Sequence, residues 1–372
     1  MISVETAREL FQLRSYLRER LLTPSASKTP ETLYHYTDAA GLLGIVTAGT
    51  LWATHYAYLN DASEFKYAVR MMKGVVEEAT VDAEPDSWKA RFRHVISQGG
   101  ASDYSAGWAE DSDEQQFVAC FSERGDELSQ WRGYGKSIGG YSLGFPFAHL
   151  QAIETRINDS QDGKALNQSS PRSTVEFFPC WYDEQAQKAL IAEGLERALH
   201  HCATTHYSVD DSSLAALLRA ILRPVSSCFK DPAFKDEREW RLVVRVWRPS
   251  YGSVRYGDDR ERTQDDIRMD QMATAHFRKG EYSLVPYVVV PVVLNAALSL
   301  SQVVVGPTPL PENARAAAMH LLHPGPGEPR IPTLGEFLRS EPEESRTPAA
   351  ATAGQRIVCT NVMNSSIPFR RV

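Results

Sequence analysis

The chain has 372 residues, of which 42% are hydrophobic and 23% are charged, and its formal net charge is −7. This composition is typical of a globular protein with a large core, and the charge gives no general reason to expect binding to nucleic acid or to an anionic membrane. The longest apolar run, around residues 288–300, is interrupted by Pro291 and Asn295 and is too short to span a bilayer.

The cysteines and the N-terminus indicate the compartment. The N-terminal 22 residues show the pattern of a charged amphipathic helix and do not resemble a signal peptide. The cysteines form an odd set without a C-x-x-C pair, which favours a reducing cytoplasm. They are Cys120, Cys180, Cys202, Cys228 and Cys359.

After a predicted linker that ends at residue 30, the segment 32–37 (TLYHYT) predicts a strand. Because strand side chains alternate, His35 and Thr37 should share one face, and Tyr34 and Tyr36 the other. A histidine in mid-strand, followed directly by a helix, suggests the floor of a pocket. The alternative is a core histidine bonded to a backbone carbonyl.

A helix should follow this strand, with Asp38 as its N-cap and Gly49 at its end. Residues 51–54 predict a second strand. Asn60 or Asp61 can cap the next helix, with Glu64 in the capping-box position.

The middle of the chain mixes irregular and periodic segments. We interpret residues 80–115 as an insertion that contains a helix at 87–96, and residues 184–225 and 248–281 as further insertions. The other predicted elements are strands at 117–121, 141–145, 174–182, 283–293, 298–305 and 356–362, a helical turn at 126–131, and helices within 184–222 and at 312–322.

These elements predict an α+β fold in which a split antiparallel sheet packs against a few helices. We expect an N-terminal helix and linker over residues 1–30 and a single elaborated catalytic-type domain over 31–339. Residues 340–355 are rich in Pro, Ala, Glu and Thr, which predicts a disordered linker, and residues 356–372 should return to the core as a strand and tail.

The segment 236–245 (DEREWRLVVR) contains the candidate catalytic acids. In an extended chain Glu237, Glu239 and Arg241 lie on one face, and the apolar residues that follow carry the strand into the core. A carboxylate held there beside a cation would stay ionised. The alternative is a solvated charge cluster in which Glu239 and Arg241 form a pair of negligible energy.

Other polar residues could line a site. Ser122 follows a strand, and capping of the next turn is favoured over a nucleophilic role because no G-x-S-x-G surrounds it. Gln130, Trp131 and Tyr134 could line a flat pocket or pack in the core. His200, His201, Cys202 and His206 lack a second ligand cluster, so we expect no metal site.

Several motifs occur in a characteristic order: LYHYT, LWA, LNDASE, CFS, WRGY, GYSLGF, FKDPAFKDEREWR, VVVGP and SIPFR. Together they resemble an uncharacterised bacterial domain family whose members occur among abortive-infection, anti-phage proteins. The similarity runs from Tyr34 to Arg370, apart from the insertions.

The opening L-Y-H-x-T, helix and L-W-A strand also resemble the start of ADP-ribosyltransferase folds, including the DNA-modifying toxin and RNA phosphotransferase branches. This resemblance implies that His35 binds a ribose of NAD and that Glu239, with Glu237 in reserve, stabilises the sugar cation. The sequence departs from the pattern at the middle motif, since no S-T-S follows a strand. The residues expected to contact NAD are His35, Tyr36, Thr37, Ser122, Trp131, Tyr134 and Arg241.

These observations predict an NAD-dependent mono-ADP-ribosyltransferase that acts as a cytoplasmic anti-phage toxin. Its acceptor would be nucleic acid or protein, with a phage-derived trigger or an inhibitory partner and no membrane association. One alternative is a non-enzymatic sensor that binds a phage component through Trp131, Tyr134 and Trp181. Another is an RNA-directed nuclease or phosphotransferase that uses His35 and the carboxylates.

Overall fold

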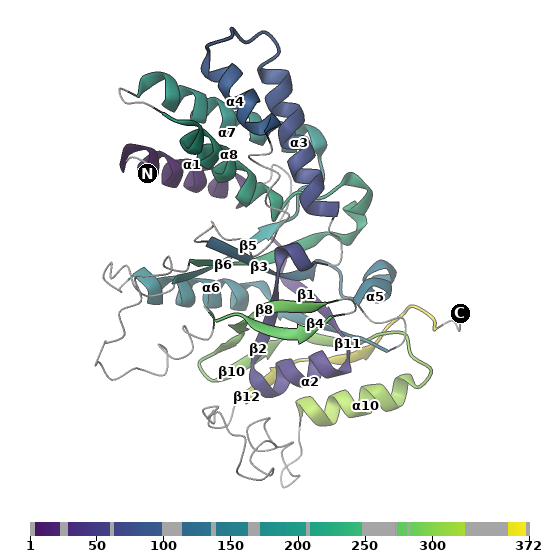
Figure 1. The fold of residues 1–372 in the computed structure, drawn as a ribbon. Helices are drawn as coiled ribbons and strands as arrows, with labels where there is room; N and C mark the ends of the chain where they lie inside the picture. The colour runs from purple at the N-terminus through teal and green to yellow at the C-terminus, as the bar shows by residue number, and fades with distance from the viewer. Residues whose placement is uncertain are drawn as a thin grey trace, which may run out of the picture. The chain divides into compact units, whose positions relative to one another are not determined.

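The computed structural model divides into two compact units (Figure 1). Residues 1–28, 54–118 and 177–243 form what we call the helical unit, and residues 29–53, 119–176 and 244–372 form the sheet unit. Within these ranges the structure describes residues 4–22, 29–59, 63–98, 114–134, 139–162, 172–205, 209–247, 272, 274–280, 283–323 and 356–369.

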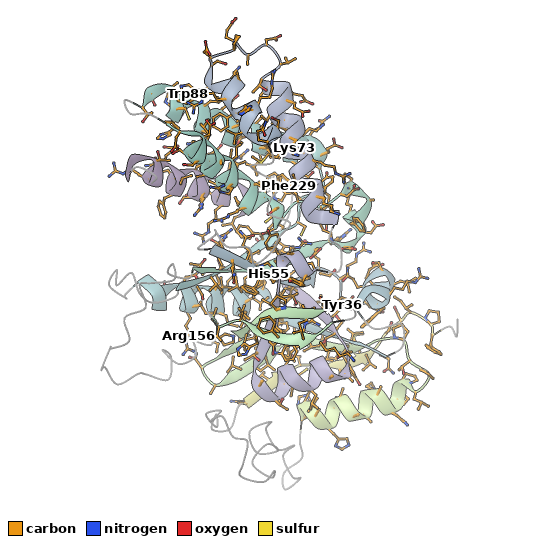
Figure 2. The ribbon with its side chains drawn as sticks, in the orientation of Figure 1. Tyr36, His55, Lys73, Trp88, Arg156 and Phe229 are labelled. Carbon is orange, nitrogen blue, oxygen red and sulfur yellow. The ribbon has the colours of Figure 1, made fainter. Side chains whose placement is uncertain are left out.

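The helical unit is built on helices that the sequence predicted mainly as insertions. They are α1 (Val4–Leu22), α3 (Ser63–Ala79), α4 (Trp88–Ser97), α7 (Glu184–Thr204) and α8 (Asp211–Ser226). Helix α1 packs against α7 and α8, while α3 packs against α4, α7 and α8. Phe229, labelled with Trp88 in Figure 2, is fully buried in the same core.

Local sequence signals explain where these helices begin. Ser87, Asp183 and Asp210 each accept a hydrogen bond from a backbone amide three residues ahead, at 3.2, 2.8 and 2.9 Å. Such caps satisfy amides that have no partner within the helix. The predicted helix at 87–96 is therefore confirmed, as α4.

The helical unit also contains parts of the strands β2 (Thr50–His55), β3 (Glu114–Ser122), β5 (Arg172–Pro179) and β6 (Glu239–Trp247). Strand β6 pairs with β3 and with β5. The end of β2 also pairs with β3, through His55 and Phe117. The remaining parts of these four strands belong to the sheet unit.

His55 gives the helical unit a predictable response to acid. The side chain is 1% exposed, and burial lowers its pKa from 6.5 to about 4. At a pH between these two pKa values, His55 binds a proton in the unfolded chain but not in the folded chain. The stability therefore falls as the pH drops from 6.5 towards 4. From pH 7.5 to pH 5 we expect a loss of about 2 kcal/mol in the free energy of unfolding.

Urea titrations at the two pH values measure this loss. His55→Gln removes the titrating group, so its free energy of unfolding should lack the corresponding dependence on pH even if it is lower throughout. An equal dependence in wild type and variant would show that His55 is not the titrating group.

The sheet unit contains a mostly antiparallel sheet. Its strands run in the order β13 (Val362–Asn364), β11 (Gln302–Val305), β4 (Tyr141–Pro146), β1 (Thr32–Thr37) and β3, while β2 pairs with β8 (Leu284–Pro291) and β8 with β7 (His276–Lys279). A smaller sheet joins β9 (Val293–Leu294), β10 (Ala297–Leu300) and β12 (Arg356–Cys359). Pairing is parallel between β11 and β13 and between β10 and β12.

Within the described residues, the sheet unit also contains the helices α2 (Ala39–Ala48), α5 (Leu128–Tyr134), α6 (Phe147–Asp162) and α10 (Pro311–Leu322). The predicted cap of α2 is confirmed, because Asp38 accepts a 2.8 Å hydrogen bond from the amide of Gly41. Gly49 ends the helix in a left-handed conformation with φ of 66°, as expected of a glycine there.

The fold thus mixes helices with a multi-strand, mostly antiparallel sheet. The apolar faces of the helices in the predicted insertions pack with those of α1 and α3 in one hydrophobic core of the helical unit. The predicted linker at 340–355 and the capping residues Asn60 and Asp61 lie outside the described residues. No described helix is long and apolar enough to cross a membrane.

Candidate functional site

His35 lies in the middle of β1, between β4 and β3. Its Nδ1–H donates to the backbone carbonyl of Cys120 at 2.9 Å, and its ring lies 5.5 Å from that of Phe121. The side chain is half-buried, and burial lowers its pKa although the bond to Cys120 opposes the shift. The structure therefore confirms the carbonyl bond that a core histidine was expected to make.

This bond also fixes the chemistry of the other ring nitrogen. A carbonyl can only accept, so Nδ1 must carry the proton, and in the neutral ring Nε2 is then a hydrogen-bond acceptor. Among the described residues, this is the one hydrogen bond of the His35 ring. It is consequently a neutral acceptor held on a rigid strand.

Tyr36 and Thr37 have structural partners. Tyr36, labelled in Figure 2, is 6% exposed; its hydroxyl donates to the carbonyl of Arg124 at 2.8 Å and accepts from the amide of Glu127 at 3.0 Å. Thr37 lies against the first turn of α2, where a Cβ on Gly41 would come within 1.8 Å of its Oγ1. Both residues therefore fix the segments that flank β1.

Ser122 and Trp131 lie on the Tyr36 side of the sheet unit. The hydroxyl of Ser122 accepts from the amide of Arg124 at 3.1 Å, which confirms the predicted capping role. Trp131 is 4% exposed and packs edge-on against Tyr36 at 4.6 Å, so it contributes to the core. Tyr134 closes α5, but its side chain lies outside the described residues.

The acidic segment forms a buried cluster in the helical unit. Glu239 is 4% exposed, and its carboxylate accepts from Lys230 at 2.5 Å and from the Nε of Arg241 at 2.7 Å. Its backbone amide donates to the hydroxyl of Tyr182 at 2.9 Å. The alternative was a solvated charge cluster in which Glu239 and Arg241 form a pair of negligible energy. It is wrong for these two residues, since both side chains are buried.

Glu237 occupies a different environment in the same cluster. Its carboxylate also accepts from Lys230, but the Glu237 side chain is 22% exposed. Arg241 donates in addition to the carbonyl of Ser227 at 3.2 Å. Of the two predicted acids, Glu237 is the one that solvent or a ligand can reach.

The structure groups the predicted residues in two sets. His35, Tyr36, Thr37, Ser122 and Trp131 belong to the sheet unit, whereas Glu237, Glu239 and Arg241 belong to the helical unit.

Sequence reasoning missed Lys230, whose buried ammonium joins Glu237 to Glu239. A lysine in a turn-rich stretch carries no signal of burial, because lysine is mostly exposed. The only available signal was the excess of acids in the following segment, which requires a cation nearby.

Comparison with known proteins gives one match. Residues 130–242 match a domain family described as a protein of unknown function, DUF2971. The match begins in α5 and ends in β6, so it includes Trp131 and the whole acidic cluster. No curated protein and no solved structure matches the chain.

Proposed function

We propose that the protein is an NAD-dependent mono-ADP-ribosyltransferase that modifies nucleic acid or protein as an effector of anti-phage defence. The observation that carries this proposal is the state of His35, a neutral ring whose Nδ1–H is fixed on a backbone carbonyl. The similarity of the motifs around this strand to ADP-ribosyltransferases supplies the reaction. The abortive-infection context rests on the ordered motifs alone.

His35 suits the role of a ribose ligand. A sugar hydroxyl needs an acceptor at a defined position, and the Nε2 of a ring fixed through Nδ1 offers one. A lowered pKa keeps the ring neutral at pH 7, so this lone pair stays available. Because the ring stands on the central part of a sheet, its position is set by the fold.

The resemblance assigns the sugar cation to Glu239, with Glu237 in reserve, and both belong to the acidic cluster. Lys230 and Arg241 occupy both oxygens of Glu239, so Glu239 is suited to hold Lys230 in place. Glu237 has an accessible side chain and shares the same lysine, which favours it over Glu239 as a catalytic acid. The order of preference is therefore the reverse of the one that the sequence suggested.

The proposed reaction breaks the bond between the nicotinamide nitrogen and the anomeric carbon of the ribose. Nicotinamide leaves with the bonding electron pair, the acceptor nucleophile forms a new bond to that carbon, and the proton of the nucleophile passes to solvent. A fixed carboxylate stabilises the positive charge that develops on the sugar before the new bond is complete.

The test is release of nicotinamide from NAD labelled in its nicotinamide ring, with denatured DNA, bulk RNA or protein extract as the acceptor. His35→Ala should reduce release about a hundredfold. His149→Ala is the matched control, since His149 is another half-buried histidine of the sheet unit with a ring nitrogen 3.0 Å from a carbonyl, that of Val292.

Other outcomes would decide against the proposal. Absence of nicotinamide release with every acceptor, with or without phage lysate, would refute it. Cleavage of labelled RNA without NAD would identify a nuclease. Equal activities of His35→Ala and His149→Ala would show that His35 does not take part in the reaction.

A further inference from the structure

Three aromatic rings lie side by side on adjacent strands of the sheet unit. The ring of Trp52 on β2 stacks on that of Tyr287 on β8, with centroids 4.3 Å apart and planes 26° apart. His276 on β7 is the cross-strand partner of Tyr287, and their ring centroids are 5.5 Å apart. We call Trp52, Tyr287 and His276 the aromatic stack.

The packing of β2 does not require an aromatic side chain at Trp52. Its side chain is 52% exposed, whereas Leu51 and Ala53 on either side are fully buried and make the core contacts of β2. A strand with this alternation needs only a polar or small residue at the outer position. The exposed face of the indole is therefore available for contact with another flat ring.

Positive charge lies at the same edge of the sheet. Arg278 and Lys279 follow His276 on β7, and both are exposed. Because side chains alternate, Arg278 shares the face of the aromatic stack. Burial raises the pKa of Tyr287, and the charge of Arg278 opposes that rise.

This combination identifies the kind of partner. Among the described residues β7 pairs only with β8, but a charged edge disfavours the addition of a second protein strand. Single strands of nucleic acid present unstacked bases together with regularly spaced phosphates, and they bind where aromatic rings adjoin cationic groups. A duplex hides the faces of its bases.

We propose that the aromatic stack binds single-stranded nucleic acid, with a base stacked on Trp52 and a phosphate beside Arg278. The surface lies on β2, β8 and β7, and does not include His35 or the acidic cluster. Binding of this kind does not depend on the use of NAD, so it can be tested whether or not the proposed transferase activity is found.

The test measures fluorescence anisotropy of labelled oligo(dT) and oligo(U) of about 15 nucleotides, which is within the site size of such surfaces. Trp52→Ala should weaken binding about five- to one-hundredfold, and Trp52→Phe should restore part of the affinity because it keeps an aromatic face. Phe11→Ala is the matched control, since Phe11 is an aromatic side chain of α1 that is 72% exposed.

Salt dependence tests Arg278 separately. The variant Arg278→Glu should reduce the slope of log affinity against log salt by about 0.7, as expected for one lost phosphate contact with a single strand. Lys89→Glu, an exposed lysine of α4, should leave the slope unchanged. No binding by wild type, equal binding of a matched duplex, or unchanged binding by Trp52→Ala would overturn the proposal.

Discussion

Replacement of Glu239 by alanine should lower the free energy of unfolding by about 3–5 kcal/mol. Glu239 neutralises two cations, Lys230 and Arg241, whose side chains are only 4% and 3% exposed. Removal of the shared carboxylate takes a charged partner from both Lys230 and Arg241. Buried charges that lose a partner cannot recover their hydration, so the cost is much larger than that of a surface pair.

Urea unfolding of wild type and variant measures this loss. Glu239→Gln keeps the shape and one acceptor oxygen, so its loss should be smaller than that of alanine. Glu237→Gln is the matched control, because Glu237 contacts the same lysine from a more exposed position. A loss below about 1 kcal/mol for Glu239→Ala would show that the cluster is hydrated in solution.

The two glutamates also separate stability from chemistry. If Glu239 only holds Lys230, its variants should lose nicotinamide release in proportion to the fraction of folded protein. If Glu237 is the catalytic acid, Glu237→Gln should lose release while the protein remains folded. The two variants together therefore show which glutamate is the catalytic acid.

Local features of the fold could be predicted from the sequence because they depend on neighbouring residues. The cap by Asp38, the left-handed Gly49 and the turn capped by Ser122 each involve partners within three residues or a single backbone angle. The alternation of His35 and Tyr36 between two faces follows from strand geometry alone. Each of these features is present.

Features that depend on distant partners were beyond such reasoning. Helical periodicity in α4, α7 and α8 shows that each helix has an apolar face, but it does not show that these faces pack on one another. The burial of Lys230 and the stacking of Trp52 on Tyr287 likewise join segments far apart in the chain. These contacts carry much of the candidate chemistry.

Asp126→Ala should release the C-terminal tail from the sheet unit, at a cost of about 2–3 kcal/mol. The Oδ1 atom of Asp126 accepts from Trp131 Nε1 at 2.8 Å and from the hydroxyl of Ser365 at 2.5 Å, while Oδ2 accepts from the amide and hydroxyl of Ser366, both at 2.7 Å. One carboxylate thus connects the turn before α5 to the residues that follow β13, and hydrogen exchange at the Ser366 amide reports on its loss.

The pH dependence of this contact has a definite sign. Burial would raise the pKa of Asp126, but the hydrogen bonds from Ser365, Trp131 and Ser366 outweigh it and hold the pKa below 3.8. The stabilisation is therefore complete above pH 3.8 and is lost as the pH falls through the lower, folded value. Asp126→Asn should retain the contacts of one oxygen and lose those of Ser366, because an amide nitrogen cannot accept. Unchanged exchange at Ser366 in both variants would mean that β13 alone holds the tail, through its pairing with β11.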